Sequence, residues 1–205
     1  MQNYKKYFIP ASRDAFFSYF CTMNVNEVIL QTVAALREGK TLLYPTDTIW
    51  GIGCDARNSE AVERLYTIKD RDHSKSMIVL LENGKWEAER GGRPTTYILP
   101  RSIWHDEMQL EVADNIPAAD GSLGIRIPNH PFCQEVIHQL GAPLVSTSAN
   151  LSGHPSPKNY YEIEETLKQR VDFCVPPLPE LFSNETRSSR IVKLHTDGTT
   201  EIIRP

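Results

Sequence analysis

The chain has 205 residues, 40% of them hydrophobic and 23% charged, which is enough to bury the core of one sizeable domain but not of two. Its formal net charge of −4 argues against an extended nucleic-acid surface, although a local basic cleft is still allowed. The four cysteines, Cys21, Cys54, Cys133 and Cys174, form no CxxC pair, so reduced thiols are favoured over a zinc site or a disulfide framework.

The first segment, residues 1–22, contains short aromatic runs that Arg13 and Asp14 interrupt, and it is too polar for a signal peptide. Met23 stands directly before a helical pattern. We expect residues 1–22 to be an extension and residues 23–205 to form the domain, so truncation to Met23 should leave folding and activity intact. No stretch is apolar for long enough to span a membrane, and we expect a cytoplasmic protein.

The remaining chain alternates helical and strand patterns. Helices are expected at residues 25–36, from Asn58 or Ser59 to about Lys69, at 132–140 and near 160–170. Strands are expected at 41–44, 77–81, 95–99, 123–127, 143–147, 171–175, 190–194 and 200–203. This alternation predicts a single α/β domain with a mixed sheet.

One dense polar stretch, PTDTIWGIG, follows the first expected strand. Thr46, Asp47 and Thr48 can donate or accept hydrogen bonds, and Gly51 and Gly53 permit a close backbone approach. The same residues also make an ordinary tight turn. GIGCDA fits a dinucleotide-binding spacing, but no helix opens directly on it, so that pattern is weak evidence.

Three cations, Lys69, Arg71 and Lys75, lie between an expected helix and an expected strand. Cations at a helix C-terminus are usually solvated. Their clustering on a short connection also suits a clamp for a polyphosphate, in which Arg71 offers a planar fork and the lysines act as point charges.

Further polar groups occur at or beside other expected strands. Arg126 lies inside an apolar strand, where it needs either a salt-bridge partner or a ligand. Ser146, Ser148 and Asn150 belong to STSANLSG, which carries more hydrogen-bonding groups than one turn requires and indicates a site. Ser189 and Arg204, near the end of the chain, could be surface residues.

Several well-known site patterns are absent from the sequence. There is no Walker motif, no G-x-S-x-G elbow and no HExxH or other close histidine pair. A P-loop fold, an elbow-type serine hydrolase and an intrinsic metal site are therefore not indicated.

The order of the motifs resembles a known family. YPTDTIWGIGCDARN, KDR followed by Lys75, RPTTYIL, GIRIPNHP, PLVSTSANLSG and the closing SSRIVKL and IIRP together resemble the YrdC-like family, the threonylcarbamoyl-AMP synthases, over about residues 25–205. The resemblance implies a single α/β domain whose twisted mixed sheet and flanking helices surround a concave site.

The resemblance also implies a reaction. A nucleotidyltransferase of this family makes threonylcarbamoyl-AMP and pyrophosphate from L-threonine, bicarbonate and ATP, with Mg²⁺ carried by the phosphates and no resident cofactor. A downstream transferase then modifies an adenosine of tRNA. Direct contact of this protein with RNA would be weak.

Site residues follow from the resemblance, motif by motif. Thr48, Arg126, Ser148 and Ser189 should bind threonine, and Lys69, Arg71, Lys75, Ser146, Asn150 and Arg204 should bind ATP. Lys69 and Arg71 are the expected catalytic residues, and their replacement by Ala should lower turnover far more than thermal stability. Trp50 replaces the usual Tyr, Ser76 the usual Pro, and Ser188-Ser189-Arg190 the usual Pro-Ser-Thr, which weakens the assignment of Ser189.

The sequence is also compatible with two other functions. One is a non-catalytic RNA-binding module, against which the acidic balance and the lack of a basic–aromatic stripe count. The other is a homologue that handles a carbamoyl-adenylate without threonine. Pyrophosphate release that depends on both threonine and bicarbonate would separate the synthase from either alternative.

Overall fold

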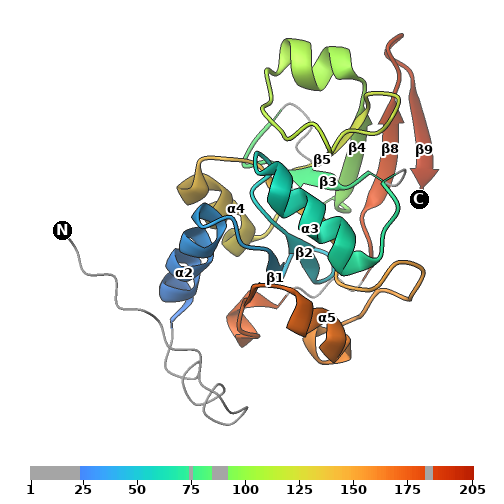
Figure 1. Ribbon diagram of the computed structural model, residues 1–205. Helices are drawn as coiled ribbons and strands as arrows, with labels where there is room; N and C mark the ends of the chain where they lie inside the picture. Colours follow the sequence, from blue (N-terminus) through green and yellow to red (C-terminus); the bar gives the residue numbers. More distant parts are fainter. Residues whose placement is uncertain (1–23, 74–75, 85–91, 183–186) are drawn as a thin grey trace, which may run out of the picture.

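The computed structural model describes residues 24–73, 76–84, 92–182 and 187–205 (Figure 1). The expected extension at residues 1–22 and the predicted phosphate ligand Lys75 lie outside these residues. None of the helices among the described residues has both the length and the hydrophobicity of a membrane span.

The described residues form one open, mixed β-sheet in the order β7-β1-β2-β6-β3-β5-β4-β8-β9. The pairs β1–β7, β3–β5 and β4–β8 are parallel and the other neighbours are antiparallel. The strands are β1 (Leu42–Tyr44), β2 (Gly51–Gly53), β3 (Ile78–Leu80), β4 (Thr95–Leu99), β5 (Leu123–Arg126), β6 (Leu144–Ser148), β7 (Phe173–Cys174), β8 (Arg190–Leu194) and β9 (Thr200–Arg204).

Among the described residues, four α-helices flank the sheet, namely α2 (Val25–Arg37), α3 (Ser59–Lys69), α4 (Pro131–Leu140) and α5 (Glu165–Arg170). Helix α2 begins with a capping box between Asn24 and Glu27, and Asn58 caps α3. Figure 1 shows α2 and α4 together at one side of the molecule and the β8–β9 hairpin at the opposite end. A π-helix (Ser102–Glu107) and 3₁₀ turns (Tyr160–Glu162, Pro179–Leu181) complete the described helical segments.

These elements confirm the predicted α/β class and nearly all predicted helices and strands. Strand β2 was not predicted, because a strand carrying two glycines in three residues lacks the usual β-branched pattern. Gly53 pairs with Leu42 of β1, and a Cβ atom on Gly53 would lie 1.9 Å from the Val145 carbonyl oxygen. Close approach of the neighbouring strand β6 therefore requires glycine at position 53.

One continuous hydrophobic core joins the helices to the central strands. Val28, Val33 and Leu36 of α2 and Val62 and Leu65 of α3 are at most 3% exposed. The packing of α2 and α3 against the central strands holds these strands in place. The strand ends and connecting loops can then present polar groups without forming the core themselves.

Candidate active site

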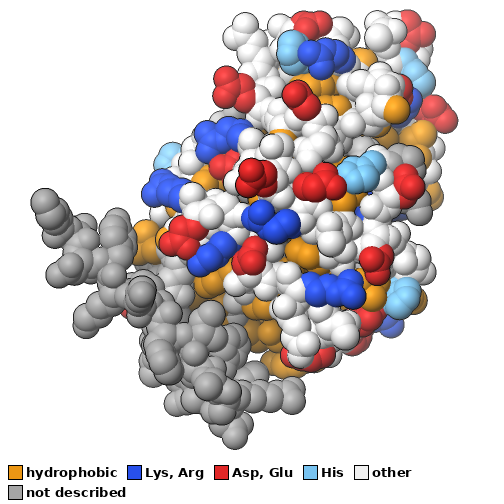
Figure 2. Space-filling view, in the orientation of Figure 1, with side chains coloured by type: hydrophobic (Ala, Val, Ile, Leu, Met, Phe, Trp, Pro, Cys, Tyr) orange, Lys and Arg blue, Asp and Glu red, His pale blue; other side chains and the backbone are white. Residues whose placement is uncertain are grey.

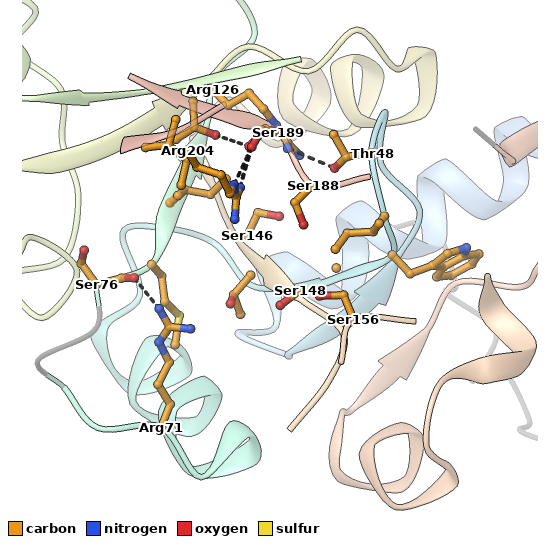
Figure 3. A pocket seen from close by; sticks show the side chains of 18 residues that line it. Thr48, Arg71, Ser76, Arg126, Ser146, Ser148, Ser156, Ser188, Ser189 and Arg204 are labelled. Atoms are coloured by element: carbon orange, nitrogen blue, oxygen red, sulfur yellow. Dashed lines mark hydrogen bonds between the residues drawn. The ribbon is translucent and has the colours of Figure 1, made fainter. Parts of the chain in front are cut away.

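A cavity of about 260 Å³ lies against the sheet (Figure 3). Strands β2, β6, β3, β5, β4, β8 and β9 each contribute to it, together with the loops that precede β2, β3 and β8. The lining residues are Thr48, Ile49, Trp50, Gly51, Arg71, Ser76, Met77, Ile78, Thr96, Arg126, Ser146, Thr147, Ser148, Ser156, Ser188, Ser189, Ile191 and Arg204.

The lining is cationic and rich in hydroxyl groups. Three arginines, six serines and three threonines line the cavity, and none of the described lining residues is acidic. Guanidinium groups and hydroxyls are the donors that carboxylates and phosphates accept from. The cavity is therefore suited to an anionic ligand.

Arg126, at the end of β5, is 4% exposed and is held at two of its nitrogens. Its Nη1 donates to Thr48 Oγ1 at 3.1 Å, and its Nη2 lies 3.3 Å from Asp47 Oδ1. Asp47 Oδ2 in turn accepts from the Asn129 backbone at 3.2 Å. Arg126 Nε has no hydrogen-bond partner among the described residues. The arginine thus has a structural ion pair and also faces the cavity.

The PTDT stretch is both a turn and a wall of the cavity. Thr46 Oγ1 donates to the Ile49 carbonyl at 2.8 Å and accepts from the Thr48 backbone N–H at 3.1 Å. Its hydroxyl also lies 3.0 Å from Thr48 Oγ1. Hydrogen bonds within the turn therefore fix Thr48 in its place at the cavity.

The C-terminal side of the cavity is built by Ser189 and Arg204 (Figure 3). Arg204 donates to the Ser189 carbonyl oxygen from Nε at 2.9 Å and from Nη2 at 2.6 Å. Ser189 Oγ lies 2.8 Å from Thr96 Oγ1. Burial lowers the pKa of Arg204, and the nearby cations Arg93 and Arg126 lower it further. Several positive charges therefore converge on this side.

Arg71 approaches the cavity from the end of α3. Asp70 ends that helix in a left-handed conformation with φ of 48°, which turns the chain sharply before Arg71. Arg71 Nη2 donates to the Ser76 carbonyl at 2.8 Å, and burial lowers the pKa of Arg71. The planar group is thus oriented by the backbone of the following loop.

Seven of the predicted site residues come together in the lining, namely Thr48, Arg71, Arg126, Ser146, Ser148, Ser189 and Arg204. The described lining does not include the predicted ATP ligands Lys69 and Asn150. Lys69 is 1% exposed and donates from Nζ to the backbone carbonyls of Ser148 and Asn150. Asn150 Nδ2 donates to two loop carbonyls, while its buried Oδ1 lacks a partner among the described residues.

Sequence reasoning missed other residues of the site. Thr96 and Ile191 look like ordinary strand residues, and only the pairing of β4 with β8 brings them to the cavity. Asp47 lies in the PTDT motif, and its ion pair with Arg126 joins segments far apart in the chain. A buried arginine in a strand was a usable signal that a carboxylate partner existed.

None of the described residues that line the cavity is a histidine, a cysteine or a carboxylate. The described residues contain no group of three or more His, Cys, Asp or Glu side chains placed to hold a metal ion. Burial raises the pKa values of the Cys54 and Cys133 thiols, which disfavours their thiolates. The arginines and hydroxyl groups of the cavity can bind and orient an anionic ligand and stabilise its charge.

A family model and relatives of known name match most of the chain. The family model Sua5_yciO_yrdC, described as "Telomere recombination", matches residues 34–205. A Pseudomonas aeruginosa protein named threonylcarbamoyl-AMP synthase is 32% identical over 152 residues, which cover 67% of this chain and 78% of that protein.

Two solved structures share the fold. P. abyssi Sua5 complexed with L-threonine superposes with a TM-score of 0.71 at 23% identity, covering 89% of this chain and 55% of that one. The chain therefore spans little more than half the length of that protein. E. coli YciO superposes with a TM-score of 0.66 at 21% identity, covering 88% of this chain and 89% of that one.

Proposed function

The chain belongs to the Sua5/YciO/YrdC family, and from this premise we propose that it is a nucleotidyltransferase that makes threonylcarbamoyl-AMP and pyrophosphate from L-threonine, bicarbonate and ATP. The observation that carries the proposal is the cavity itself, in which Arg71, Arg126 and Arg204 face one space with nine hydroxyl side chains. Such a lining suits a ligand set with one carboxylate and several phosphates.

The threonine end of the ligand set is assigned to Arg126, Thr48, Ser148 and Ser189. Arg126 is the fitting partner for the amino-acid carboxylate because Asp47 and Thr48 fix its guanidinium at two points. A pre-oriented fork loses little freedom on binding and gains strong, charge-assisted hydrogen bonds. Hydroxyl groups nearby can serve the amine and the side-chain hydroxyl.

The nucleotide end is assigned to Arg71, Arg204 and Ser146. Burial lowers the pKa values of both arginines, which means that their charges are incompletely solvated before ligand binds. Phosphate oxygens would accept charge-assisted hydrogen bonds from both guanidinium groups. The triphosphate would carry its own Mg²⁺ as part of the substrate.

The chemistry needs no covalent enzyme intermediate. Threonine's amine and bicarbonate give a carbamate with loss of water. A carbamate oxygen then attacks the α-phosphorus of ATP, a new P–O bond forms, the bond to the bridging oxygen breaks, and pyrophosphate leaves. The nucleophile is already anionic, so positioning and stabilisation of charge on the phosphates can supply the catalysis.

The product is an activated mixed anhydride, and a downstream transferase would place its threonylcarbamoyl group on tRNA in the cytoplasm. The face of the molecule in Figure 2 shows acidic and basic side chains interspersed, without a continuous basic band. This face therefore offers no extended basic surface, and with the formal net charge of −4 we expect any RNA contact to be weak.

Pyrophosphate release from ATP by the purified chain tests the proposal. We expect release only when threonine and bicarbonate are both present, with threonylcarbamoyl-AMP detected by mass spectrometry in matching amounts. Release at the same rate without threonine would contradict the proposal and favour a carbamoyl-adenylate enzyme. Absence of any ATP turnover together with binding of tRNA would favour the binding module.

A further inference from the structure

Lys69 fastens the loop after β6 to the end of α3. Its Nζ donates to the carbonyl oxygen of Ser148 at 2.5 Å and to that of Asn150 at 2.7 Å. Its own carbonyl accepts from the Ser152 backbone N–H at 3.0 Å. A single residue thus makes three hydrogen bonds to this loop, two from its side chain and one from its main chain.

The fastened segment, residues 148–152, begins inside the cavity. Ser148 lines the cavity and pairs with Gly51 of β2, and the Ala149 backbone N–H donates to the Trp50 carbonyl at 2.9 Å. Gly51 and Trp50 also line the cavity. A displacement of this segment would therefore move two walls of the site together.

The Lys69 side chain contacts this loop and does not line the cavity. It is 1% exposed, lies outside the described lining of the cavity, and uses two of its three N–H donors on backbone carbonyls. Arg71, two residues further on, does line the cavity. The two cations of the KDR segment therefore have different surroundings.

We propose that Lys69 is a positioning residue that holds residues 148–152 in the shape required by the cavity, and that it does not itself bind the phosphates. The helix end provides the rigid support, because α3 packs into the core through Val62 and Leu65. The Nζ group provides the tie, because its N–H donors satisfy two backbone carbonyls that would otherwise lose these hydrogen bonds. The catalytic consequence rests on the proposed function, whereas the structural tie does not.

Amide hydrogen–deuterium exchange on the full chain without ligand tests the tie directly. In Lys69→Met, the amides of residues 149–152 should exchange about tenfold faster or more, while those of α2 stay as protected as in the original protein. Lys69→Gln keeps a neutral donor and should lose less protection than Lys69→Met. Lys40→Met, which removes an exposed lysine paired with Glu38, is the matched control and should change neither region.

Unchanged exchange at residues 149–152 in Lys69→Met would overturn the proposal, as would an equal loss of protection in α2 and in the loop. If Lys69→Met fails to fold, the same comparison is made with Lys69→Gln, for which faster loop exchange with protected α2 supports the tie and unchanged loop exchange overturns it.

Nucleotide binding separates positioning from phosphate contact. The Kd values of AMP, ADP and ATP are measured for the original protein and for Lys69→Gln. If Lys69 is a positioning residue, its replacement should raise the Kd by the same factor for all three nucleotides, because the loop is displaced whatever the number of phosphates. A loss that grows from AMP to ATP would overturn the second half of the proposal. If the original protein binds no nucleotide, the proposed function fails and the exchange measurement still decides the tie.

Discussion

Arg126 combines two roles that compete at most buried arginines. A charge that is 4% exposed requires a partner, and Asp47 supplies one at 3.3 Å. The same guanidinium faces the cavity and is also held by Thr48. Removing the positive charge would leave Asp47 buried without its counter-ion, so a truncation would confuse stability with binding.

The charge-conserving change Arg126→Lys avoids this confusion. It should raise the KM for threonine by about 10–100-fold, because an ammonium cannot reproduce the planar two-point contact with a carboxylate. The melting temperature should fall only slightly, since the charge next to Asp47 is kept. Pyrophosphate release at varied threonine concentration gives the KM.

Arg57→Lys is the control for that experiment, because Arg57 makes a similar ion pair with Asp55 but lies outside the described cavity lining and has a side chain 44% exposed. It should leave the threonine KM unchanged. An unchanged KM in Arg126→Lys as well would show that Arg126 serves the fold alone.

At the scale of elements, strand β2 is the clearest case of tertiary structure overriding local preference. Its sequence GIG has a poor strand propensity, yet β1 and β6 pair with it on both sides. Its two glycines have different roles. Gly53 lets the β6 backbone approach, whereas Gly51 lies in the cavity lining beside Ser146.

Substitution by alanine should separate these two glycines. Gly53→Ala places a Cβ atom 1.9 Å from the Val145 carbonyl oxygen and should lower the free energy of unfolding by about 3 kcal/mol or more. In Gly51→Ala the Cβ atom would lie 3.2 Å from Ser146 Oγ and 3.3 Å from the Thr147 carbonyl oxygen, distances that shifts of a few tenths of an ångström relieve, so the loss should be smaller, about 1–2 kcal/mol. Urea unfolding measures both, and equal stabilities would contradict this account of β2.

Helices α2 and α3 illustrate the opposite case, in which local sequence decided the element. Asn24 and Asn58 each accept a hydrogen bond from the first turn, and the buried positions follow a helical period. Capping and periodicity act within a few residues, so both helices could be predicted to within one or two residues of their observed ends.

Stability of the whole molecule should depend on pH through Lys69. Burial, and secondarily the charge of Arg71, lowers the pKa of Lys69 from 10.5 to about 7. Between these pH values the unfolded chain binds more protons than the folded one, so the free energy of unfolding increases as the pH rises. Between pH 7 and pH 9, the lowered pKa of Lys69 should increase the free energy of unfolding by on the order of 2 kcal/mol.

Urea unfolding at pH 7 and pH 9 checks this expectation. The original protein should gain stability relative to Lys69→Met, in which position 69 does not titrate, as the pH is raised. Asp70 and Arg170, which pair at 3.8 Å beside the helix end, are unchanged in both proteins and cancel in the comparison. The same pH dependence in both proteins would exclude Lys69 as its source.

Lys69 and Arg71 also show how far sequence reasoning reached into the site. Both were expected to face phosphates because they belong to one short cationic segment. The structure brings Arg71 to the cavity and turns the Lys69 side chain onto the carbonyls of Ser148 and Asn150. The change Arg71→Ala should still lower turnover more than stability, whereas for Lys69→Ala we now expect both to fall.

The α/β class, most element boundaries and the segments that carry polar chemistry could be predicted from the sequence, because capping, periodicity and motif composition depend on neighbouring residues. Which side chains meet became known only from the fold. Thr96 reaches Ser189 across 93 positions, and Asp47 reaches Arg126. Such contacts depend on which strands lie next to one another in the sheet, and this spatial order is set by packing between segments that are far apart in the chain.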